Sequence, residues 1–404
     1  MYDVYKIRED FPIFAKKING KFNTFLDSAA STQKPLAVIN KMMSISFDNY
    51  ANVHRGIYQL SEQMTAMYEE ARNTVHSFIS AKSSDEIVFT RNATESINLV
   101  AQTWGRKNLR RGDEVLISEA EHHANLVPWQ VLSKELGFEL KIFKIADDGS
   151  FVFEEFAKLL SKKTKLVSVT AMSNVLGTIF PIRQIVQKAH ETGASVLIDA
   201  CQYVVHHPID VQAWDCDFLV FSGHKLYGPT GIGVLYGKLE LLKEMPPYQF
   251  GGDMVETVSY TDTTFAEPPA RFEAGTPAIV QAIGLAEAIK YLSQLDMENI
   301  CKYEAELTDY AQEKLSQIKG LRLIGTAPGK GGVFSFVVEN IHAADLAFVL
   351  DKEGVSIRVG HHCAQPLVER FGYSSVARAS LGLYNTREDI DRLVDAIEKA
   401  KTFF

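Results

Sequence analysis

The sequence predicts an α/β fold, in which a mostly parallel central sheet carries helices on both faces and is followed by a smaller α+β domain. Two observations predict this fold. Short, nearly continuous apolar runs alternate with longer amphipathic runs from about residue 21 to residue 237, which is typical of buried parallel strands joined by helices. After about Gly284 this alternation stops, and a long amphipathic stretch leads into another group of strands and helices.

The apolar runs locate the expected strands of the larger part. They lie at 86–90, 114–118, 166–170, 195–199 and 217–221. Amphipathic runs predict the intervening helices at 95–104, 128–136 and 182–191. Several of the strands end in polar residues, and sheets of this kind bind ligands at the carboxyl ends of their strands.

The last third of the chain predicts a smaller unit with its own core. Its expected elements are a long helical run at 285–318, a strand at 332–338, a helix at 343–353, a short strand at 355–359 and a last helix at 386–401. The sequence shows no low-complexity linker before this unit. We therefore expect the two parts to be joined by a long helix.

A chain of 404 residues is long enough for two or three domains. We place a large domain at 22–284 and a small C-terminal domain at 285–404. The N-terminal segment 1–21 is expected to join the small domain, which also contains the loop at 358–366.

Composition and charge exclude several classes of protein. The chain has a net charge of −8, with 46% hydrophobic and 23% charged residues, which suits a soluble globular protein and argues against a general nucleic-acid surface. No apolar run is long enough to span a bilayer, and the charged N-terminus lacks an apolar signal core. Four cysteines without C-x-x-C spacing indicate a reducing compartment. We expect a cytoplasmic protein that binds neither nucleic acid nor membrane.

The most informative stretch is 217–236, where an apolar strand ends in the turn Ser222-Gly223-His224-Lys225 before a glycine-rich segment. A lysine forms a Schiff base only when its amine is deprotonated, so it needs a site where burial or nearby charge lowers its pKa. Lys225, between apolar runs and glycine turns, is suitably placed. A solvent-facing loop lysine is the ordinary alternative, and three further features favour the first interpretation.

Two of these features are polar strand ends. Asp199 ends the strand at 195–199, where a buried carboxylate needs a positive partner such as a protonated pyridine nitrogen; capping of the next helix is the alternative. Asn92 to Ser96 begin a helix whose free N–H groups suit a phosphate. Asn92 and Glu95 also have the spacing of an ordinary capping box.

The third feature is His122, which follows the strand at 114–118. An imidazole at a strand end can stack on a flat heteroaromatic ring and carry protons. Histidine pairs at 122–123, 206–207 and 361–362 raise the alternative of a metal site. Adjacent residues on a strand point to opposite faces, so a pair rarely supplies two ligands to one ion. No pair has the i, i+4 spacing of a helical zinc site, and the pattern therefore argues against a metal site.

Among the cysteines, Cys363 has the surroundings of a nucleophile. Residues 358–364 form a strand that leaves its sheet into a short loop, where cationic and imidazole neighbours favour the thiolate. Cys201 and Cys216 lie within or beside apolar strands and are expected to be buried structural residues. Cys301 lies on the long helical run, and nothing in its surroundings indicates a function.

Together these segments resemble the class V aminotransferase family. The segment 222–231 resembles its lysine motif, and 199–202 resembles the aspartate motif that precedes it. Within the family, four further stretches resemble SufS-type, or type II, cysteine desulfurases: EHHANLVPWQ (121–130), MSNVLGT (172–178), RFEAGTP (271–277) and RVGHHCAQP (358–366). The resemblance runs from LDSAAS (26–31) to LGLYNT (381–386).

The resemblance implies a fold and a role for each matching residue. The fold would be the PLP-dependent transferase fold type I, with pyridoxal 5′-phosphate as cofactor. The catalytic residues would be Lys225 as the Schiff-base lysine, Cys363 as the nucleophile and His122 as the residue that stacks on the ring and moves protons. The other cofactor ligands would be Asp199 on the pyridine nitrogen, Gln202 on the phenolic oxygen, and Thr94, Ser222, His224 and Thr276 on the phosphate, with Thr276 coming from a second subunit. The substrate would be held by Arg378, Asn174, Arg358 and His54.

The implied reaction converts L-cysteine to L-alanine and leaves a persulfide on Cys363 for iron–sulfur cluster assembly. Selenocysteine lyase, acting on L-selenocysteine, or another class V activity is the alternative. The short cysteine loop implies a sulfur acceptor of the SufE or SufU kind, and the family implies a homodimer. Two departures are Cys201, where relatives have a small residue, and Phe250, which interrupts a glycine-rich loop. The stretch at 278–284 also lacks the glycines often found there.

Overall fold

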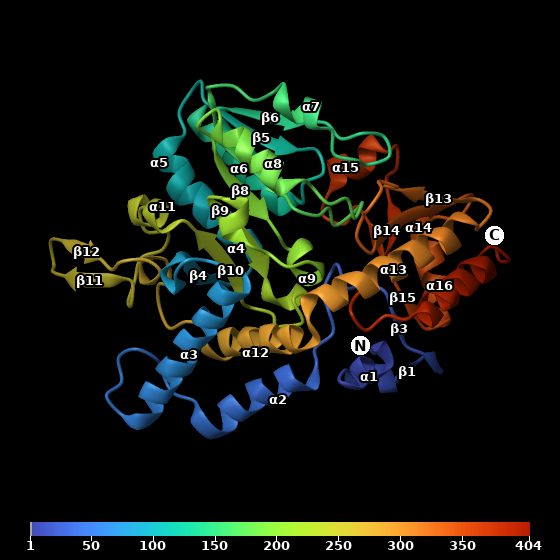
Figure 1. Cartoon of the computed structure of the whole chain (residues 1–404), viewed down its shortest axis with the longest axis horizontal. Coiled ribbons are helices and arrows are strands. Elements are labelled where there is room, and N and C mark those ends of the chain that lie inside the picture. The colour runs from blue at the N-terminus through green and yellow to red at the C-terminus, as the bar shows by residue number, and fades with distance from the viewer. Residues whose placement is uncertain (1) are drawn as a thin grey trace.

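A seven-stranded sheet forms the centre of the larger part of the molecule in the computed structural model, which describes residues 2–404 (Figure 1). Its strand order is β4-β10-β9-β8-β7-β5-β6. The strands are β4 (Ile87–Thr90), β5 (Glu114–Ser118), β6 (Glu139–Phe143), β7 (Thr164–Thr170), β8 (Ser195–Asp199), β9 (Phe218–Ser222) and β10 (Gly233–Gly237). The strands from β9 to β6 are parallel, so the prediction of a mostly parallel α/β sheet is confirmed.

Strand β10 runs antiparallel to both of its neighbours, β9 and β4. The ten residues between β9 and β10 form only a 3-10 turn, Gly223–Lys225, and a glycine-rich loop. A parallel connection needs a crossover of about a dozen residues or more, usually a helix. The chain therefore folds back, and Gly233 pairs with Ser222.

Helices cover both faces of this sheet and make two separate cores. On one face, α4 (Ala93–Val100) and α6 (Val127–Leu136) pack on one set of alternating strand residues. On the other face, α3 (Gln59–Phe78), α8 (Ile182–His190) and α12 (Ile279–Leu295) pack on the other set. Burial on both faces explains why the strands are nearly continuous apolar runs.

A four-stranded antiparallel sheet forms the smaller part, with the order β13-β14-β17-β16. Its strands are β13 (Leu321–Ile324), β14 (Val333–Val338), β16 (Arg358–Gly360) and β17 (Val376–Ser380). Three helices pack with it in a third core: α13 (Met297–Ser316), α14 (Ala343–Lys352) and α16 (Arg387–Ala400). The N-terminal helix α1 (Val4–Glu9) is tied to α16, because Arg8 pairs with Asp389 at 2.7 Å.

Two expected elements are divided in the structure. The run at 285–318 was expected to be one helix, and this is wrong: α12 ends at Leu295 and α13 begins at Met297. Asp296 has a left-handed φ of 65° and its side chain accepts from the Glu298 N–H, which is N-cap geometry. The strand expected at 355–359 is also two strands, since β15 (Val355–Ser356) pairs with β3 (Thr24–Phe25) and β16 pairs with β17. The domain boundary at residue 284 lies inside α12 and stays a prediction.

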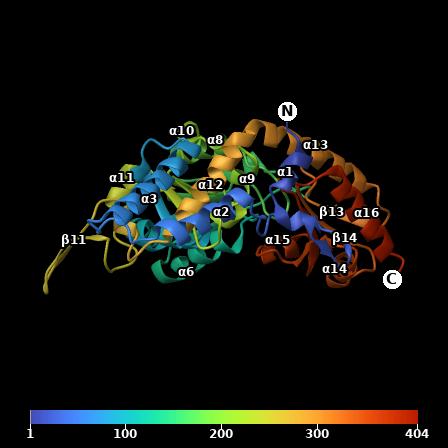
Figure 2. The same ribbon diagram turned by 90° about the horizontal axis from the view of Figure 1, so that it is seen from below.

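A two-stranded hairpin, β11 (Val255–Val258) and β12 (Thr263–Phe265), projects from the large sheet's side of the molecule (Figures 1 and 2). Its tip carries the exposed Val258 and Tyr260. Within residues 2–404, no helix has both the length and the apolar character needed to cross a membrane.

A buried ion pair attaches the 271–277 segment to the large sheet. Arg72 on α3 donates to Glu273 over 2.7 and 3.0 Å, and the two side chains are 3% and 8% exposed. Glu273 also accepts from the Tyr68 hydroxyl at 3.0 Å and from the Phe89 N–H at 2.7 Å. Removing one partner of such a pair leaves an uncompensated buried charge.

We therefore expect Arg72→Met to lower the free energy of unfolding by about 3–5 kcal/mol in a urea titration. The matched control is Arg106→Met, because the Arg106–Glu135 pair is 42% and 45% exposed; its expected cost is below about 1 kcal/mol. An equally small loss for both variants would contradict the view that Glu273 is desolvated.

Candidate active site

A cavity of about 220 Å³ lies at the carboxyl ends of the parallel strands, where the cysteine loop meets the large sheet. Among the residues that line it are Thr94, His122, Asn174, Asp199, Gln202, Ser222, His224, Lys225, Arg358, Cys363 and Arg378. The structure thus brings together every predicted site residue except His54 and Thr276. Convergence of the strand ends accounts for the meeting of the residues from the large sheet. Arg358, Arg378 and Cys363 come from β16, β17 and the cysteine loop of the smaller part.

His54 and Thr276 lie outside this cavity. The exposed His54 ring bonds to Glu69 over 2.9 Å. Thr276 lines a different cavity of about 400 Å³, which also contains Tyr248 and Glu95. Neither residue joins the site within one chain, so their predicted roles require a second subunit and stay predictions.

Asp199 brings a buried negative charge to the cavity. It is the last residue of β8, it is 5% exposed, and its Oδ1 accepts from the Cys201 N–H at 3.0 Å. Across residues 2–404, no lysine, arginine or histidine lies within ion-pair distance of this carboxylate. Since an isolated buried carboxylate is costly, the site fits a ligand that carries a positively charged nitrogen.

Hydrogen bonds to the backbone of the preceding residue, His224, fix the turn that carries Lys225, and they do not involve the Lys225 amine. The carbonyl oxygen of the preceding His224 accepts from Lys34 Nζ at 2.7 Å and from the Ser31 and Thr32 hydroxyls at 3.2 Å. Burial lowers the pKa of Lys34 to about 8. The Lys225 amine forms no ion pair or side-chain hydrogen bond within the described part of the chain. The sequence analysis identified 26–31 as a family motif, but it did not predict that this segment would bind the His224 oxygen.

The start of α4 provides a place for an anion. Asn92 caps the helix by accepting from the Glu95 N–H, and the Ala93 N–H donates to Ser222 Oγ at 2.9 Å. A Cβ on Gly233 would lie 2.5 Å from Asn92 Cα, so a glycine is needed for β10 to pass this turn. Thr94 and His224 complete the edge of the cavity. Helix N–H groups and hydroxyls at this point suit a phosphate.

His122 is neutral and has a defined tautomer. Its Nδ1 accepts from the Ala124 N–H at 3.0 Å, so the hydrogen of the neutral ring lies on Nε2. Burial, and then the charge of Lys225, lower the pKa of His122 to about 4. Glu121, the residue before His122, is fully buried, and burial raises its pKa to about 8. Its carboxyl accepts from the Asn125 amide and the Thr170 N–H at 2.7 and 3.0 Å, which fixes this segment.

The cysteine loop has a strained backbone. His362 and Cys363 have φ values of 53° and 56°, and a left-handed conformation costs about 1–2 kcal/mol for each non-glycine residue. Two hydrogen bonds from the large part of the molecule hold the loop. Asn174 Nδ2 donates to the His362 oxygen at 2.8 Å, and the His123 N–H donates to the Cys363 oxygen at 2.7 Å. Burial, and then Arg378, lower the pKa of His362 to about 3. His123 carried no assigned role in the sequence.

The four cysteines differ in their surroundings. The expectation that Cys201 and Cys216 are buried is confirmed, and Cys201 also lines the cavity, with its sulfur 4.0 Å from Ser222 Oγ. Cys363 is partly exposed and lines the same cavity. Cys301 lies on α13, where its sulfur is 3.2 Å from His207 Nδ1.

Arg378 is fitted to bind a carboxylate. Its side chain is buried, Nη2 donates to Asp27 Oδ1 at 3.0 Å, and Nη1 donates to the Asn174 oxygen at 3.0 Å. Its Nε has no hydrogen-bond partner within the described residues, and burial lowers the pKa of the guanidinium. Arg358 lies at the same cavity and is half-buried. Arginine forks recognise planar carboxylates well.

Comparison with known proteins agrees with this geometry. A probable cysteine desulfurase of Synechocystis sp. is 51% identical over 401 residues, which cover 98% of this chain and 96% of that protein. A cysteine desulfurase of Synechococcus elongatus is 48% identical over 99% of this chain, and the chain spans 64% of the length of that relative. The crystal structure of the cysteine desulfurase CsdA from Escherichia coli, in its S-sulfonic acid form, is 36% identical. It has a TM-score of 0.92 and covers 100% of both chains.

The family match extends over almost the whole chain. The family described as aminotransferase class-V matches residues 24–393, a range that contains the lysine turn, the aspartate strand end and the cysteine loop. The chain belongs to the class V aminotransferase family.

Proposed function

We propose that this chain is a pyridoxal-phosphate-dependent cysteine desulfurase of the SufS type, which moves the sulfur of L-cysteine onto Cys363 and releases L-alanine. One observation carries the proposal: a single cavity contains the lysine turn, an unpaired buried carboxylate and a partly exposed thiol. The relatives named as cysteine desulfurases, at about half identity, support it. Transamination needs the first two features and has no use for Cys363.

The residues of the cavity fit the cofactor. Lys225 would hold its aldehyde carbon, Asp199 its ring nitrogen, and the turn at 92–94 with Ser222 and His224 its phosphate. Gln202 would reach the phenolic oxygen. When bound, pyridoxal phosphate supplies an electron sink for the negative charge that removal of the substrate's α-proton leaves.

The side chains around the cavity bind the substrate and move its protons. Arg378, Asn174 and Arg358 bind and orient the substrate carboxylate. The Lys225 amine takes the α-proton and can return it, and the Nε2–H of neutral His122 donates a hydrogen bond beside it.

Cys363 performs the sulfur transfer. Its thiolate attacks the sulfur of the substrate, so that an S–S bond forms and the bond between Cβ and sulfur breaks. The electrons of the broken bond remain on carbon, which takes a proton and becomes the methyl group of L-alanine. No external oxidant is needed, because the reduction of Cβ balances the oxidation of sulfur.

We expect Cys363→Ser to abolish formation of alanine and persulfide, since a hydroxyl does not accept the sulfur, while the visible absorbance of the bound cofactor stays unchanged. Cys301→Ser is the matched control, because Cys301 lies outside the cavity, and it should turn over like the parent. Alanine production by Cys363→Ser at the parental rate would contradict the assignment.

The sulfur acceptor belongs to the same proposal. Cys363 also lines a groove of about 350 Å³, whose outer wall carries Val127 and Val131 of α6. Both valines are nearly half exposed, which suits a protein surface that docks an apolar partner. We place an acceptor of the SufE or SufU kind there, with iron–sulfur cluster assembly as the use of the sulfur. The cytoplasm is the proposed setting, because the free thiols need reducing conditions.

An acceptor of either kind should raise the rate of alanine formation by about tenfold or more, because removal of the persulfide frees Cys363 for another cycle. Val131→Lys should raise the acceptor concentration that gives half of this stimulation by about tenfold, since it places a charge in the groove. Ile142→Lys, at an equally exposed isoleucine on β6, is the control. Turnover that neither acceptor changes would refute the proposed partner.

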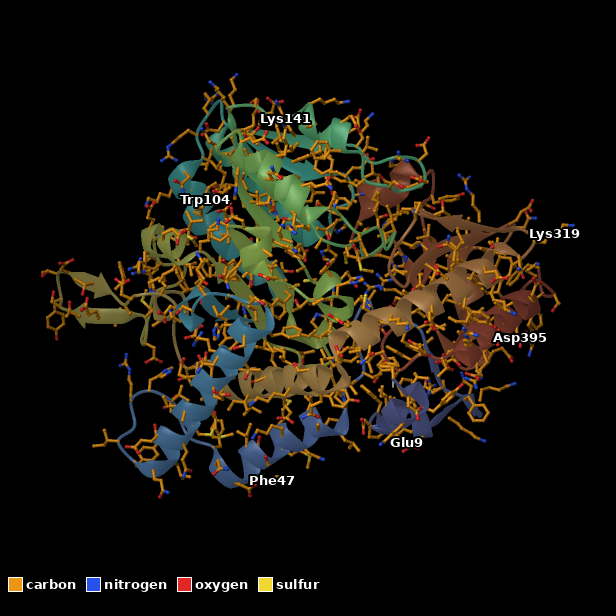
Figure 3. All side chains as sticks on the ribbon, in the orientation of Figure 1. Glu9, Phe47, Trp104, Lys141, Lys319 and Asp395 are labelled. Carbon is orange, nitrogen blue, oxygen red and sulfur yellow. The ribbon has the colours of Figure 1, made fainter. Side chains whose placement is uncertain are left out.

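The proposed homodimer rests on exposed apolar residues near the large sheet. They are Ile39 and Met43 on α2 (Leu36–Ser44), Phe47 and Tyr50 after it, and Ile57 before α3. Phe47 is 80% exposed and lies on the outer surface (Figure 3). Exposed large apolar side chains on these successive segments favour an interface, and the proposed dimer is the source of Thr276 for the partner's cavity.

Light scattering of the purified protein should give the mass of a dimer, and Phe47→Glu should shift it toward the monomer, because a charge at the interface loses its solvation. Phe348→Glu is the control at an exposed phenylalanine on α14 in the smaller part, and it should remain dimeric. A monomeric parent protein would contradict the proposal.

A further inference from the structure

We propose that His123 is a positioning residue, which clamps the loop of Cys363 in its strained conformation and thereby keeps the thiol at the cofactor cavity. The inference deepens the proposed desulfurase and rests on it. His123 follows the cofactor-facing His122 in the chain, but its own contacts are with the cysteine loop.

His123 contacts the loop with both its backbone and its ring. The backbone N–H donates to the Cys363 oxygen at 2.7 Å, and the ring Nε2 accepts from the Gln365 N–H at 3.0 Å. These two bonds hold the chain on either side of Ala364, at Cys363 and at Gln365. Because Gln365 begins the helix α15 (Gln365–Arg370), its N–H has no partner inside the helix.

The ring therefore supplies a cap that the loop itself lacks. The N-cap residue of α15 is Ala364, whose methyl group cannot accept a hydrogen bond. Pro366 lies in the first turn of the helix. A side chain from a different segment takes the place of the usual serine or aspartate. Loss of this acceptor would leave the helix start and the preceding turn without their anchor.

A second contact holds the far end of α15 to the same segment. Arg370, the last residue of the helix, pairs with Glu119 at 3.0 Å. Glu119 and His123 both follow β5, so the loop and its helix are attached at two points to the end of one strand of the large sheet. The position of the thiol thus depends on the large sheet as well as on the smaller one.

The clamp matters because the loop is strained and the thiol lies between two cavities. His362 and Cys363 are both left-handed, a conformation that persists only where surrounding contacts enforce it. Cys363 lines the cofactor cavity and also the outer groove, where His123 forms part of the wall. A released loop would relax its backbone and move the thiol from the cavity toward the groove.

The clamp works only while the ring is neutral, since a protonated Nε2 cannot accept. Burial, and then the charge of His361, hold the pKa of His123 below its ordinary value of 6.5. The titratable groups that face the ring are His122 on its own segment, and His361 and Cys363 on the loop. The residues of α4 and α6 in the groove are uncharged. The clamp is therefore closed at neutral pH and opens as the pH falls through the lowered pKa.

The test uses the cofactor-loaded protein and three variants. His123→Leu removes the acceptor, and His123→Gln restores one that does not titrate. His342→Gln is the matched control, because that exposed histidine also accepts a backbone N–H, from Ala344 at 3.3 Å, but lies in the smaller part away from the cavity. The first readout is the rate of iodoacetamide alkylation of Cys363, followed by peptide mass spectrometry with Cys301 as the internal reference. Cofactor absorbance and alanine formation are measured on the same samples.

We expect His123→Leu to alkylate at Cys363 about fivefold faster and to form alanine at least about tenfold more slowly, with unchanged cofactor absorbance. His123→Gln should stay within about twofold of the parent at pH 8. As the pH falls through the lowered pKa of His123, the parent should come to alkylate faster than His123→Gln, because only the parent loses its acceptor. His342→Gln should match the parent throughout.

Four results would overturn the inference. The first is alkylation of Cys363 in His123→Leu within about twofold of the parent, and the second is alanine formation by His123→Gln as slow as by His123→Leu. The third is a pH response of alkylation that the parent and His123→Gln share. The fourth is loss of the cofactor band in His123→Leu alone. If the parent binds cofactor but transfers no sulfur, the proposed function fails, and the alkylation rates still decide whether His123 holds the loop.

Discussion

A buried carboxylate without a cation is the constraint on which the site depends. Asp199 lies at the end of β8, in the sheet's interior, and within residues 2–404 no cationic side chain pairs with its carboxylate. Because parallel strands end at one edge, the same edge collects the lysine turn after β9, the helix start after β4 and the histidine segment after β5. A ligand with a protonated ring nitrogen and an anionic group satisfies both ends of this arrangement, as pyridoxal phosphate does.

The sequence predicted the elements that are buried on both faces better than those set by tertiary contacts. The runs at 114–118 and 195–199 coincide with β5 and β8, because a fully buried strand has a continuous apolar pattern. The break at Asp296 was missed, since one left-handed residue between two amphipathic helices leaves their periodicity almost intact. The division of 355–359 was also missed, because two strand partners, not the local pattern, decide it.

The same distinction applies to the site. Residues at strand ends, such as Asp199, His122 and Lys225, could be selected because their chemistry is unusual for their position. His123 and Lys34 could not, because contacts with distant residues determine what they do: His123 meets Gln365, and Lys34 meets the backbone of His224. Their only signal in the sequence was membership of the family motifs at 121–130 and near 26–31. A strained thiol loop therefore depends on groups that local patterns do not reveal.

The absorbance spectrum of the purified protein, followed by L-cysteine and reductant with assay of alanine and sulfide, tests the central claim most directly. We predict a visible band from the cofactor bound at Lys225, and alanine and sulfide in equal amounts. A band without sulfide would contradict the role of Cys363. Absence of a band after added pyridoxal phosphate would contradict the assignment of Lys225 and Asp199, and with it the whole account.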